Sequence, residues 1–581
     1  MEKALLHETG IQITLLLLLI IIVAGLVVFV LKFLFIYGRL LRKKEQRETQ
    51  EEIKNLTPEE IARYEQREKE LDYVLPEGKL SGNKPPSDEK GIISNVNSIE
   101  ELRFFPVKRR TSSFQKTVSS QLSRLILWFI GTAIFWLVLG TTVGLYIGIK
   151  FVVPDIEQES WLNFGRLRPA HTNMVFWGWA SLAMTGLAHY VICRVSIMEN
   201  FNIRQGYVSL ILINLAVLAG TISILAGVNN GGGEYREYIW PIMLTFGAGV
   251  TLSLHNFFRP VIHRVPREIY ISNWYILSAV MFIVIVIIIA YIPFWQNGVG
   301  ETIIQGYYMH QAIGMWFMLL SLGLMYYFLS QQLNKPIYSY SLGVLAFWTH
   351  VFFYTLIGPH HFIFSAIPWR IQTSAIVASA GMVIPVVAGT ANFLLTFNGA
   401  WYQLSTSYTL PFYFISIIFY FTGSLQGTVE AFRYTNLLWH FTDFTVAHSH
   451  LTMYGIITFM LWGFSYTLVP RLTGKEPPKI WVGIHFWLAL IGLIFYVIAL
   501  MIGGTQTGQG WINKRPFIEG VINMAPYWLW RAIGGTMMWV SHLIFAYNFF
   551  KMTRTRESIK IPRTPAEILA AKKQLQKTEF N

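Results

Sequence analysis

The chain has 581 residues, of which 53% are hydrophobic and only 13% are charged. Soluble proteins average about 25% charged residues, so this composition excludes an ordinary soluble protein and places most of the chain in a lipid bilayer. The single cysteine, Cys193, excludes an intramolecular disulfide, a heme attached through a CxxCH motif and a thiolate-bridged dicopper site.

The first predicted element is a membrane anchor. Residues 11–35 form an apolar run that is longer than the roughly 7 to 15 residues of a signal-peptide core, and no small-residue cleavage site follows it. We therefore expect residues 1–38 to be a retained transmembrane helix. Residues 39–123 are polar and predict a cytoplasmic tether, with a helix over 58–72 and a linker rich in Pro, Gly and Ser over 76–86.

The middle of the chain predicts most of the fold. Apolar runs of about 20 residues, each long enough to cross a bilayer, recur through residues 124–553 and number roughly twelve. The loops between them are short and leave no soluble domain. We expect an all-α integral membrane protein: a twelve-helix bundle with one extra N-terminal transmembrane helix, followed by a basic cytoplasmic tail over residues 554–581.

The net charge of +14 indicates membrane topology and not a nucleic-acid partner. The basic clusters fall on alternate sides of successive spans, so all of them share one face, which the positive-inside rule makes cytoplasmic. This places the N-terminus outside and the tether and C-terminus inside. The clusters span residues 39–47, 108–124, 259–267, 471–479 and 551–577.

Six histidines from four spans are expected at one depth, in the outer half of the membrane. Ionisable residues inside a bilayer are costly, and they are functional candidates for that reason. A single histidine on an apolar helix is more often a packing residue, but six at the same depth favour metal binding, and neutral imidazole suits iron and copper. They are His171, His310, His360, His361, His448 and His450. We expect His189, His255, His263, His350, His440 and His542, which lack such partners, to serve packing.

The spacing of these histidines indicates how they share metals. His448 and His450 are two residues apart and point about 200° apart on a helix, so each would bind a different cofactor. His171 at a matching depth could complete a six-coordinate iron suited only to electron transfer, while the other iron keeps an open position. A bend at Gly358–Pro359 would let His360 and His361 converge with His310 on a second metal.

Six ordered segments carry a resemblance to a known family. They are GRLRPAH (165–171), EYIWP (237–241), HQAIG (310–314), YTLIGPHH (354–361), HFTDFTVAHSH (440–450) and WRAIGG (530–535). Together they resemble the catalytic subunit of heme-copper oxygen reductases of the C-family, the cytochrome c oxidases of the cbb type. The resemblance covers residues 119–552, nearly the whole predicted bundle.

The resemblance assigns cofactors and site residues. It implies a low-spin heme b held by His171 and His450, a high-spin heme b held by His448, and copper (CuB) held by His310, His360 and His361. Tyr354 matches the family's redox tyrosine, which is covalently joined to a copper ligand, here His310. Arg168 and Arg531 match residues that hold heme propionates, a role that suits guanidinium groups. Glu234 or Glu237 would help bind a calcium ion near those propionates.

The implied function is a terminal respiratory oxidase of the inner (cytoplasmic) membrane. It reduces dioxygen to water and takes electrons from cytochrome c through partner membrane subunits that carry heme c, with proton uptake from the cytoplasm. A nitric oxide reductase of the same superfamily is the alternative, although that enzyme needs extra glutamates beside its non-heme iron and no tyrosine. A non-catalytic heme-binding sensor is a third reading, which would leave the copper ligands unexplained.

The sequence departs from the family pattern in its proton-handling residues. Gln426 stands where the family has a glutamate, and Glu430 follows one turn later. Tyr327 and Tyr340 remain as a predicted proton path from the cytoplasm. Met318, Gly343 and Ala346 replace hydroxyl or imidazole groups along that path, so we expect it to hold more water and fewer side-chain hydroxyls.

Overall fold

The computed structural model describes residues 47–48, 50–71, 118–231, 233–266, 268–292, 297–554, 568–570 and 572. The predicted anchor over residues 1–38, the linker over 76–86 and nearly all of the basic tail lie outside the described residues. Within the tether, α3 (Pro58–Leu71) forms where a helix is expected. Its first turn is closed by Thr57 and Glu60, because each side chain accepts a hydrogen bond from the backbone N–H of the other.

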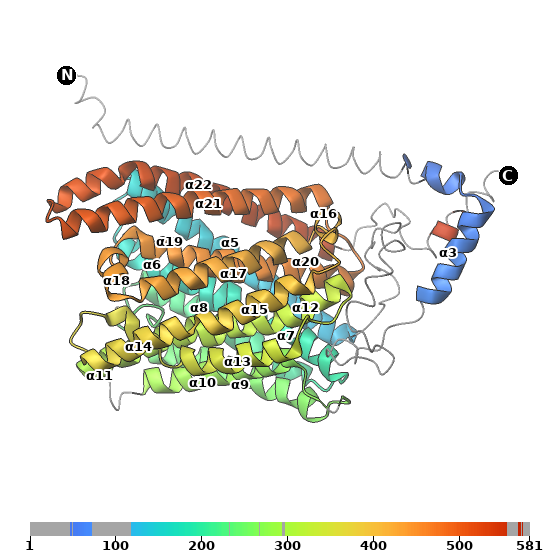
Figure 1. Cartoon of the computed structure of the whole chain (residues 1–581), viewed down its shortest axis with the longest axis horizontal. Coiled ribbons are helices and arrows are strands. Elements are labelled where there is room, and N and C mark those ends of the chain that lie inside the picture. The colour runs from blue at the N-terminus through green and yellow to red at the C-terminus, as the bar shows by residue number, and fades with distance from the viewer. Residues whose placement is uncertain are drawn as a thin grey trace, which may run out of the picture.

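The described part of the chain contains helices and no strands, and the helices of the bundle run side by side along one direction (Figure 1). Among the residues that the structure describes, nine helices are long and apolar enough to cross a membrane. Three more, α9, α13 and α22, lie alongside them and complete the predicted twelve, so the all-α membrane fold is confirmed. Eight of the twelve carry one label each: α5 (Ser120–Val152), α8 (Ile203–Leu225), α9 (Trp240–Ile262), α10 (Ile271–Tyr291), α13 (Tyr340–Tyr354), α17 (Leu410–Glu430), α21 (Lys479–Ile512) and α22 (Phe517–Thr553).

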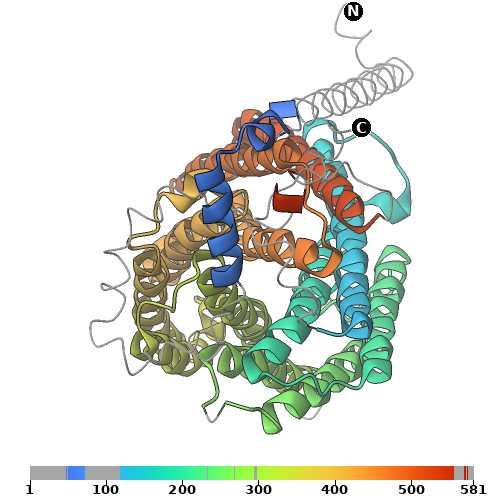
Figure 2. The same ribbon diagram turned by 90° about the vertical axis from the view of Figure 1, so that its right-hand side faces the viewer.

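The other four long helices are built from consecutive pieces. They are α6, η4 and α7 (Phe164–Asn173, Met174–Ala180, Ser181–Ser196); α11, η5 and α12 (Val299–His310, Gln311–Met318, Leu319–Leu333); α14 and α15 (Trp369–Gly381, Val383–Thr396); and α19, η7 and α20 (Asp443–His450, Leu451–Thr458, Phe459–Thr473). Figure 2 looks along the helices and shows them packed into one rounded cluster.

Three of these composite helices form the interior of the bundle. The most apolar stretches of 164–196, 299–333 and 443–473 are 94%, 94% and 89% buried, whereas those of the other candidate spans are 39–56% buried. A helix that is covered on all sides can be apolar all round, and the less buried spans are left to face lipid. The interior helices carry four of the six predicted metal-binding histidines: His171, His310, His448 and His450.

Each interior helix changes from α to π geometry just after a predicted ligand. The π segments begin at Met174, Gln311 and Leu451, which follow His171, His310 and His450. A π turn holds one more residue than an α turn and therefore redirects the side chains around it, and such turns concentrate at functional sites. The backbone is thus irregular in the three places where ligands must be aimed.

Candidate metal centre

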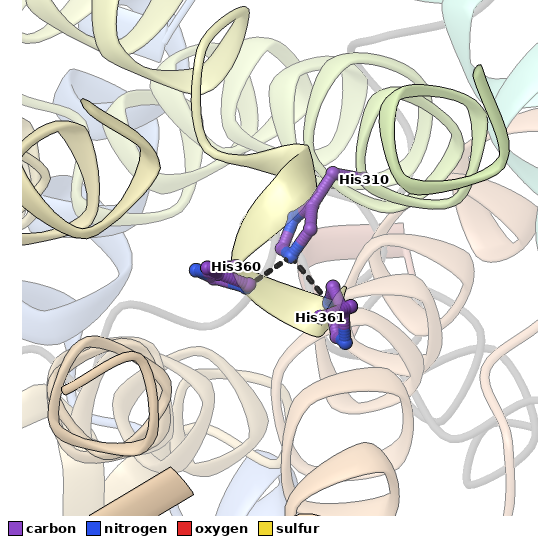
Figure 3. Close-up of side chains that lie close together, drawn as sticks. All are labelled: His310, His360 and His361. Atoms are coloured by element: carbon purple, nitrogen blue, oxygen red, sulfur yellow. Dashed lines mark hydrogen bonds between the residues drawn. The ribbon is translucent and has the colours of Figure 1, made fainter. Parts of the chain in front are cut away.

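His310, His360 and His361 converge on one point, and we call them the histidine triad. The Nε2 atom of His310 lies 2.6 Å from the Nε2 atom of His360 and 2.6 Å from that of His361 (Figure 3). One ring nitrogen from each of the three residues falls within 4.8 Å of the others. The triad could therefore hold a metal ion through imidazoles alone, without a carboxylate.

The expected bend positions two members of the triad. Residues 358–362 form a short 3₁₀ turn, η6, with Pro359 in its first positions. Gly358 lies against Gly306 of α11, where a Cβ atom at residue 358 would come within 2.5 Å of the Gly306 carbonyl oxygen. This close backbone approach, which only glycine permits, brings His360 and His361 to the end of α11, where His310 lies.

Ser379 fixes the protonation of one triad member. Its hydroxyl donates to the Ala375 carbonyl at 2.7 Å, so it accepts the Nδ1–H of His360 at 2.6 Å. The lone pair of His360 is therefore on Nε2, which faces His310. A metal ion bound among the three rings would be met by this lone pair, and an oriented imidazole of this kind is what a metal ligand requires.

Tyr354 lies beside the triad, as its motif predicts. Its ring meets the ring of His310 edge-on, with centroids 5.5 Å apart, and stacks on His350 at 4.7 Å. A Cβ atom at residue 314 would lie 1.7 Å from Cε1 of Tyr354, so Gly314 is necessary for this placement. His350, which we expected only to serve packing, supports the tyrosine and donates its Nε2–H to the Gly314 carbonyl at 3.1 Å.

His171 and His450 face one another across a gap, and we call them the electron-transfer pair. Their ring centroids are 6.4 Å apart and their planes differ by 13°. A metal bonded to one nitrogen of each ring at about 2.0 Å would hold the centroids about 6.2 Å apart, so the gap fits one hexacoordinate iron. The Nδ1–H groups donate to the carbonyls of Gly140 at 2.7 Å and Val446 at 2.8 Å, which leaves both Nε2 atoms free to bind.

His448 is held by the residue that departs from the family pattern. Its Nδ1–H donates to the amide oxygen of Gln426 at 3.1 Å, and a carboxylate oxygen of Glu430 lies 3.4 Å from the same nitrogen. A neutral amide thus takes the hydrogen bond, with a carboxylate beside it. A Cβ atom at residue 427 would lie 3.0 Å from the His448 ring, so Gly427 leaves room for that ring.

The two predicted propionate-binding arginines differ in their surroundings. Arg531 is 8% exposed, lies 4.4 Å over the ring of Phe151 and is 3.5 Å from a carboxylate oxygen of Asp443. Arg168 is more exposed and forms an ion pair with Glu234. A buried guanidinium near the electron-transfer pair fits a carboxylate-bearing heme.

Glu237 lies in the loop before α9 and is buried, with one carboxylate oxygen accepting a hydrogen bond from Asn173 at 2.9 Å. Burial raises the pKa of this carboxyl to about 7. A nearby cation would keep it ionised, so the chemistry of this position is compatible with the predicted calcium ion.

The predicted proton-path tyrosines occupy different settings. The Tyr340 hydroxyl donates to the Ile269 carbonyl at 3.2 Å, and the Tyr327 ring packs edge-on against Tyr190 at 6.1 Å. The neighbouring Tyr326 is buried, and sequence reasoning missed it. A Cβ atom at Gly343 would lie 2.7 Å from Cδ1 of Ile271 and 3.4 Å from the Tyr326 hydroxyl, so Gly343 allows close packing beside that phenol.

The fold is that of a multi-pass membrane protein, and its buried histidines are placed where they could hold metal ions. Residues 124–537 match the family described as Cytochrome C and Quinol oxidase polypeptide I, and the chain belongs to this family. The resemblance predicted from the six segments is confirmed, and the chain is a multi-pass membrane enzyme of the heme-copper oxygen reductase class.

Named relatives cover most of the chain. It is 30% identical over 489 residues to the cytochrome c oxidase subunit 1 homolog of Agrobacterium tumefaciens (strain T37), which covers 79% of this chain and 88% of that protein. It is 29% identical to the Cbb3-type cytochrome c oxidase subunit CcoN1 of Stutzerimonas stutzeri, covering 75% of this chain and 95% of the relative. A solved heme-copper terminal oxidase dimer shares the fold, with a TM-score of 0.63 at 16% identity over 79% of this chain and 91% of that one.

Proposed function

We propose that this chain reduces dioxygen to water at a high-spin heme and copper centre. The observation that carries the proposal is the convergence of three imidazole nitrogens of the histidine triad beside the ring of Tyr354. When bound, the heme iron and copper would supply most of the electrons that dioxygen needs. The phenol of Tyr354 would supply one further electron and a proton, which a tyrosine joined to His310 is suited to do.

The residues around the centre have separate tasks in this proposal. His448 would hold the high-spin heme and His360, oriented by Ser379, would hold copper. The electron-transfer pair would hold the low-spin heme, with Arg531 and Arg168 binding propionates. Glu234 and Glu237 would bind a calcium ion near them, since hard oxygen ligands suit that cation.

Electrons would come from cytochrome c through partner membrane subunits that carry heme c. The support is twofold: the sequence has no CxxCH motif for a heme c of its own, and the named relatives are cytochrome c oxidase subunits. The enzyme would lie in the inner membrane with its histidine-rich half outside, as the positions of its basic clusters support.

Protons would come from the cytoplasmic side, along α12 and α13. Tyr340 would lie at the entrance and Tyr327 further in, with Tyr326 as a further phenol, whose hydroxyl lies beside Gly343. Tyr354 would receive the proton.

Turnover of the purified enzyme with reduced cytochrome c tests the proposal. We expect about four electrons to be consumed per dioxygen, with no peroxide released, and little activity toward nitric oxide. Rapid reduction of nitric oxide with slow dioxygen turnover would contradict the proposal and favour the nitric oxide reductase alternative.

A further inference from the structure

An arginine stacked on a tryptophan lies where α14 meets the short helix α18 (Arg433–Trp439), at one end of the bundle (Figure 1). The guanidinium carbon of Arg433 lies 3.6 Å from the centroid of the Trp369 ring. Nη2 of Arg433 donates to the Thr373 hydroxyl at 2.8 Å. That hydroxyl itself donates to the Trp369 carbonyl at 2.9 Å, so the three residues hold one another in place.

The positive charge of Arg433 is not neutralised within the described part of the chain. Its Nε atom is buried without a hydrogen-bond partner, and none of the ion pairs between described residues includes Arg433. Glu430, three residues earlier, directs its carboxylate to His448 instead. Arg370, next to Trp369, is exposed and adds a second positive charge. A half-buried charge costs free energy unless an anion accompanies it, so this site calls for an anion.

An exposed face of α14 leads from this charge toward the middle of the membrane. Trp369, Thr373 and Val377 recur every four residues, so they lie on one face of the helix, and all three are exposed. Val377 is 64% exposed and lies about 12 Å along the helix axis from Trp369. The following helix, α15, exposes Ile384 and Val387. An apolar helix surface thus continues inward from the guanidinium.

Exposed aromatic side chains surround the charged end of this face. Trp369 is 60% exposed, and Phe432 and Tyr434, which flank Arg433 in the chain, are 43% and 75% exposed. Tryptophan and tyrosine gather at the level of the lipid headgroups, so these residues place Arg433 at that level. A soluble anion would use only the charge, whereas a phospholipid would use both the guanidinium and the apolar face below it.

We propose that Arg433 and Arg370 bind the phosphate of an anionic phospholipid, whose acyl chains lie along the exposed face of α14. Stacking on Trp369 and the hydrogen bond to Thr373 fix the plane of the Arg433 guanidinium, and a fixed planar fork suits a phosphate. Two positive charges favour a lipid of net negative charge, such as phosphatidylglycerol, over zwitterionic phosphatidylcholine. The proposal does not depend on the proposed oxygen chemistry.

Fluorescence quenching by brominated lipid tests the proposal on the intact enzyme in vesicles. Cys193 is the only cysteine of the chain and is buried, so Val377→Cys adds one accessible thiol for a fluorescent label on the α14 face. The vesicles contain phosphatidylcholine with a small fraction of phosphatidylglycerol, and either lipid carries the bromine. We expect brominated phosphatidylglycerol to quench at least about fivefold more than its share of the lipid predicts, the factor that one arginine supplies at an anionic lipid surface.

Arginine variants of the labelled enzyme show whether the charges carry the preference. Arg433→Gln combined with Arg370→Gln should abolish the preference for phosphatidylglycerol, with the optical spectrum of the enzyme unchanged. Arg166→Gln is the matched control and should keep the preference. Arg166 is also half-buried, but it lies on α6 and donates to the Leu225 carbonyl at 3.0 Å.

A label on another helix controls for lipid that surrounds the whole bundle. Ala248 is exposed and lies eight residues after Trp240, the first residue of α9. Val377 lies eight residues after Trp369, so the two labels are at similar depths. Arg236, just before α9, is already in an ion pair. A label at Ala248→Cys should therefore show no preference for phosphatidylglycerol.

Equal quenching by the two brominated lipids at residue 377 would overturn the proposal, as would the same preference at residue 248 or an equal loss in Arg166→Gln. Loss of the preference when inorganic phosphate is added at constant ionic strength would also overturn it, because the arginines would then bind a free anion. Absence of quenching by either lipid at residue 377 would mean that a polypeptide, and not a lipid, covers α14.

Discussion

The histidine triad and the electron-transfer pair are both built from imidazole side chains, but they differ in the distance between their rings. Triad nitrogens lie 2.6 Å apart, whereas the rings of the pair stand 6.4 Å apart and nearly parallel. In the proposed function the pair would hold the low-spin heme from both sides and leave no position for a substrate. The triad would hold copper through three imidazoles and could leave room for a substrate.

The two sites also differ in what orients their ligands. Backbone carbonyls of Gly140 and Val446 hold the electron-transfer pair. The histidine triad and His448 together form what we call the reactive side, and side chains orient its ligands. Ser379 accepts a hydrogen bond from His360, and Gln426 accepts one from His448. A carbonyl acceptor cannot be changed by substitution, but a side-chain acceptor can, so the reactive side is where evolution or mutation can adjust metal affinity and potential.

Removing His171 should abolish the electron-transfer site and leave the histidine triad intact. In His171→Ala we expect loss of the low-spin optical spectrum and turnover below about a thousandth of the unmodified rate, because electrons no longer reach the reactive side. Copper should remain, since the triad is built from other elements. Loss of copper together with the low-spin heme would show that the two sites are not independent.

Removing the phenol should affect only the reactive side. Tyr354→Phe keeps the ring beside His310 but cannot give a proton and an electron, so dioxygen turnover should fall at least about 100-fold. Optical spectra of both hemes should persist. Complete reduction of dioxygen to water at a normal rate in this variant would show that the role assigned to Tyr354 is wrong.

Ser379 tests whether side-chain orientation matters to the triad. Ser379→Ala removes the acceptor for His360, and loss of such an outer partner typically weakens metal binding about 10- to 100-fold. Copper retained after titration with a chelator measures the effect, and the low-spin heme serves as an internal control. Copper retention equal to that of the unmodified enzyme would mean that packing alone orients His360.

The smallest effect is expected at Gln426. Gln426→Glu replaces a neutral acceptor by a carboxylate, which gives His448 more negative character and favours the oxidised iron. The high-spin heme potential should fall by about 60 mV or less, measured by redox titration, with the low-spin potential unchanged. A rise in the high-spin potential would contradict this account of the hydrogen bond at 3.1 Å.

The candidate ligands, which the structure brings close together, could be picked out from the sequence because histidine in a membrane span is costly and the motif fixes its spacing. Their partners could not, since Gly140 is 31 residues from His171 in the chain and Ser379 is 19 from His360. Depth along a helix follows from counting residues, but rotation about its axis does not. The sequence therefore predicts only a packing role for His350 and does not single out Tyr326 beside Tyr327. The N-terminal anchor stays a prediction.

The most direct test of the account is the ratio of non-covalent heme to copper in the purified enzyme, because acid extraction leaves the covalent heme c of partner subunits behind. The electron-transfer pair, His448 and the histidine triad predict about two extractable hemes per copper, one of them low-spin. Two extractable hemes with non-heme iron in place of copper would contradict the account and indicate a nitric oxide reductase.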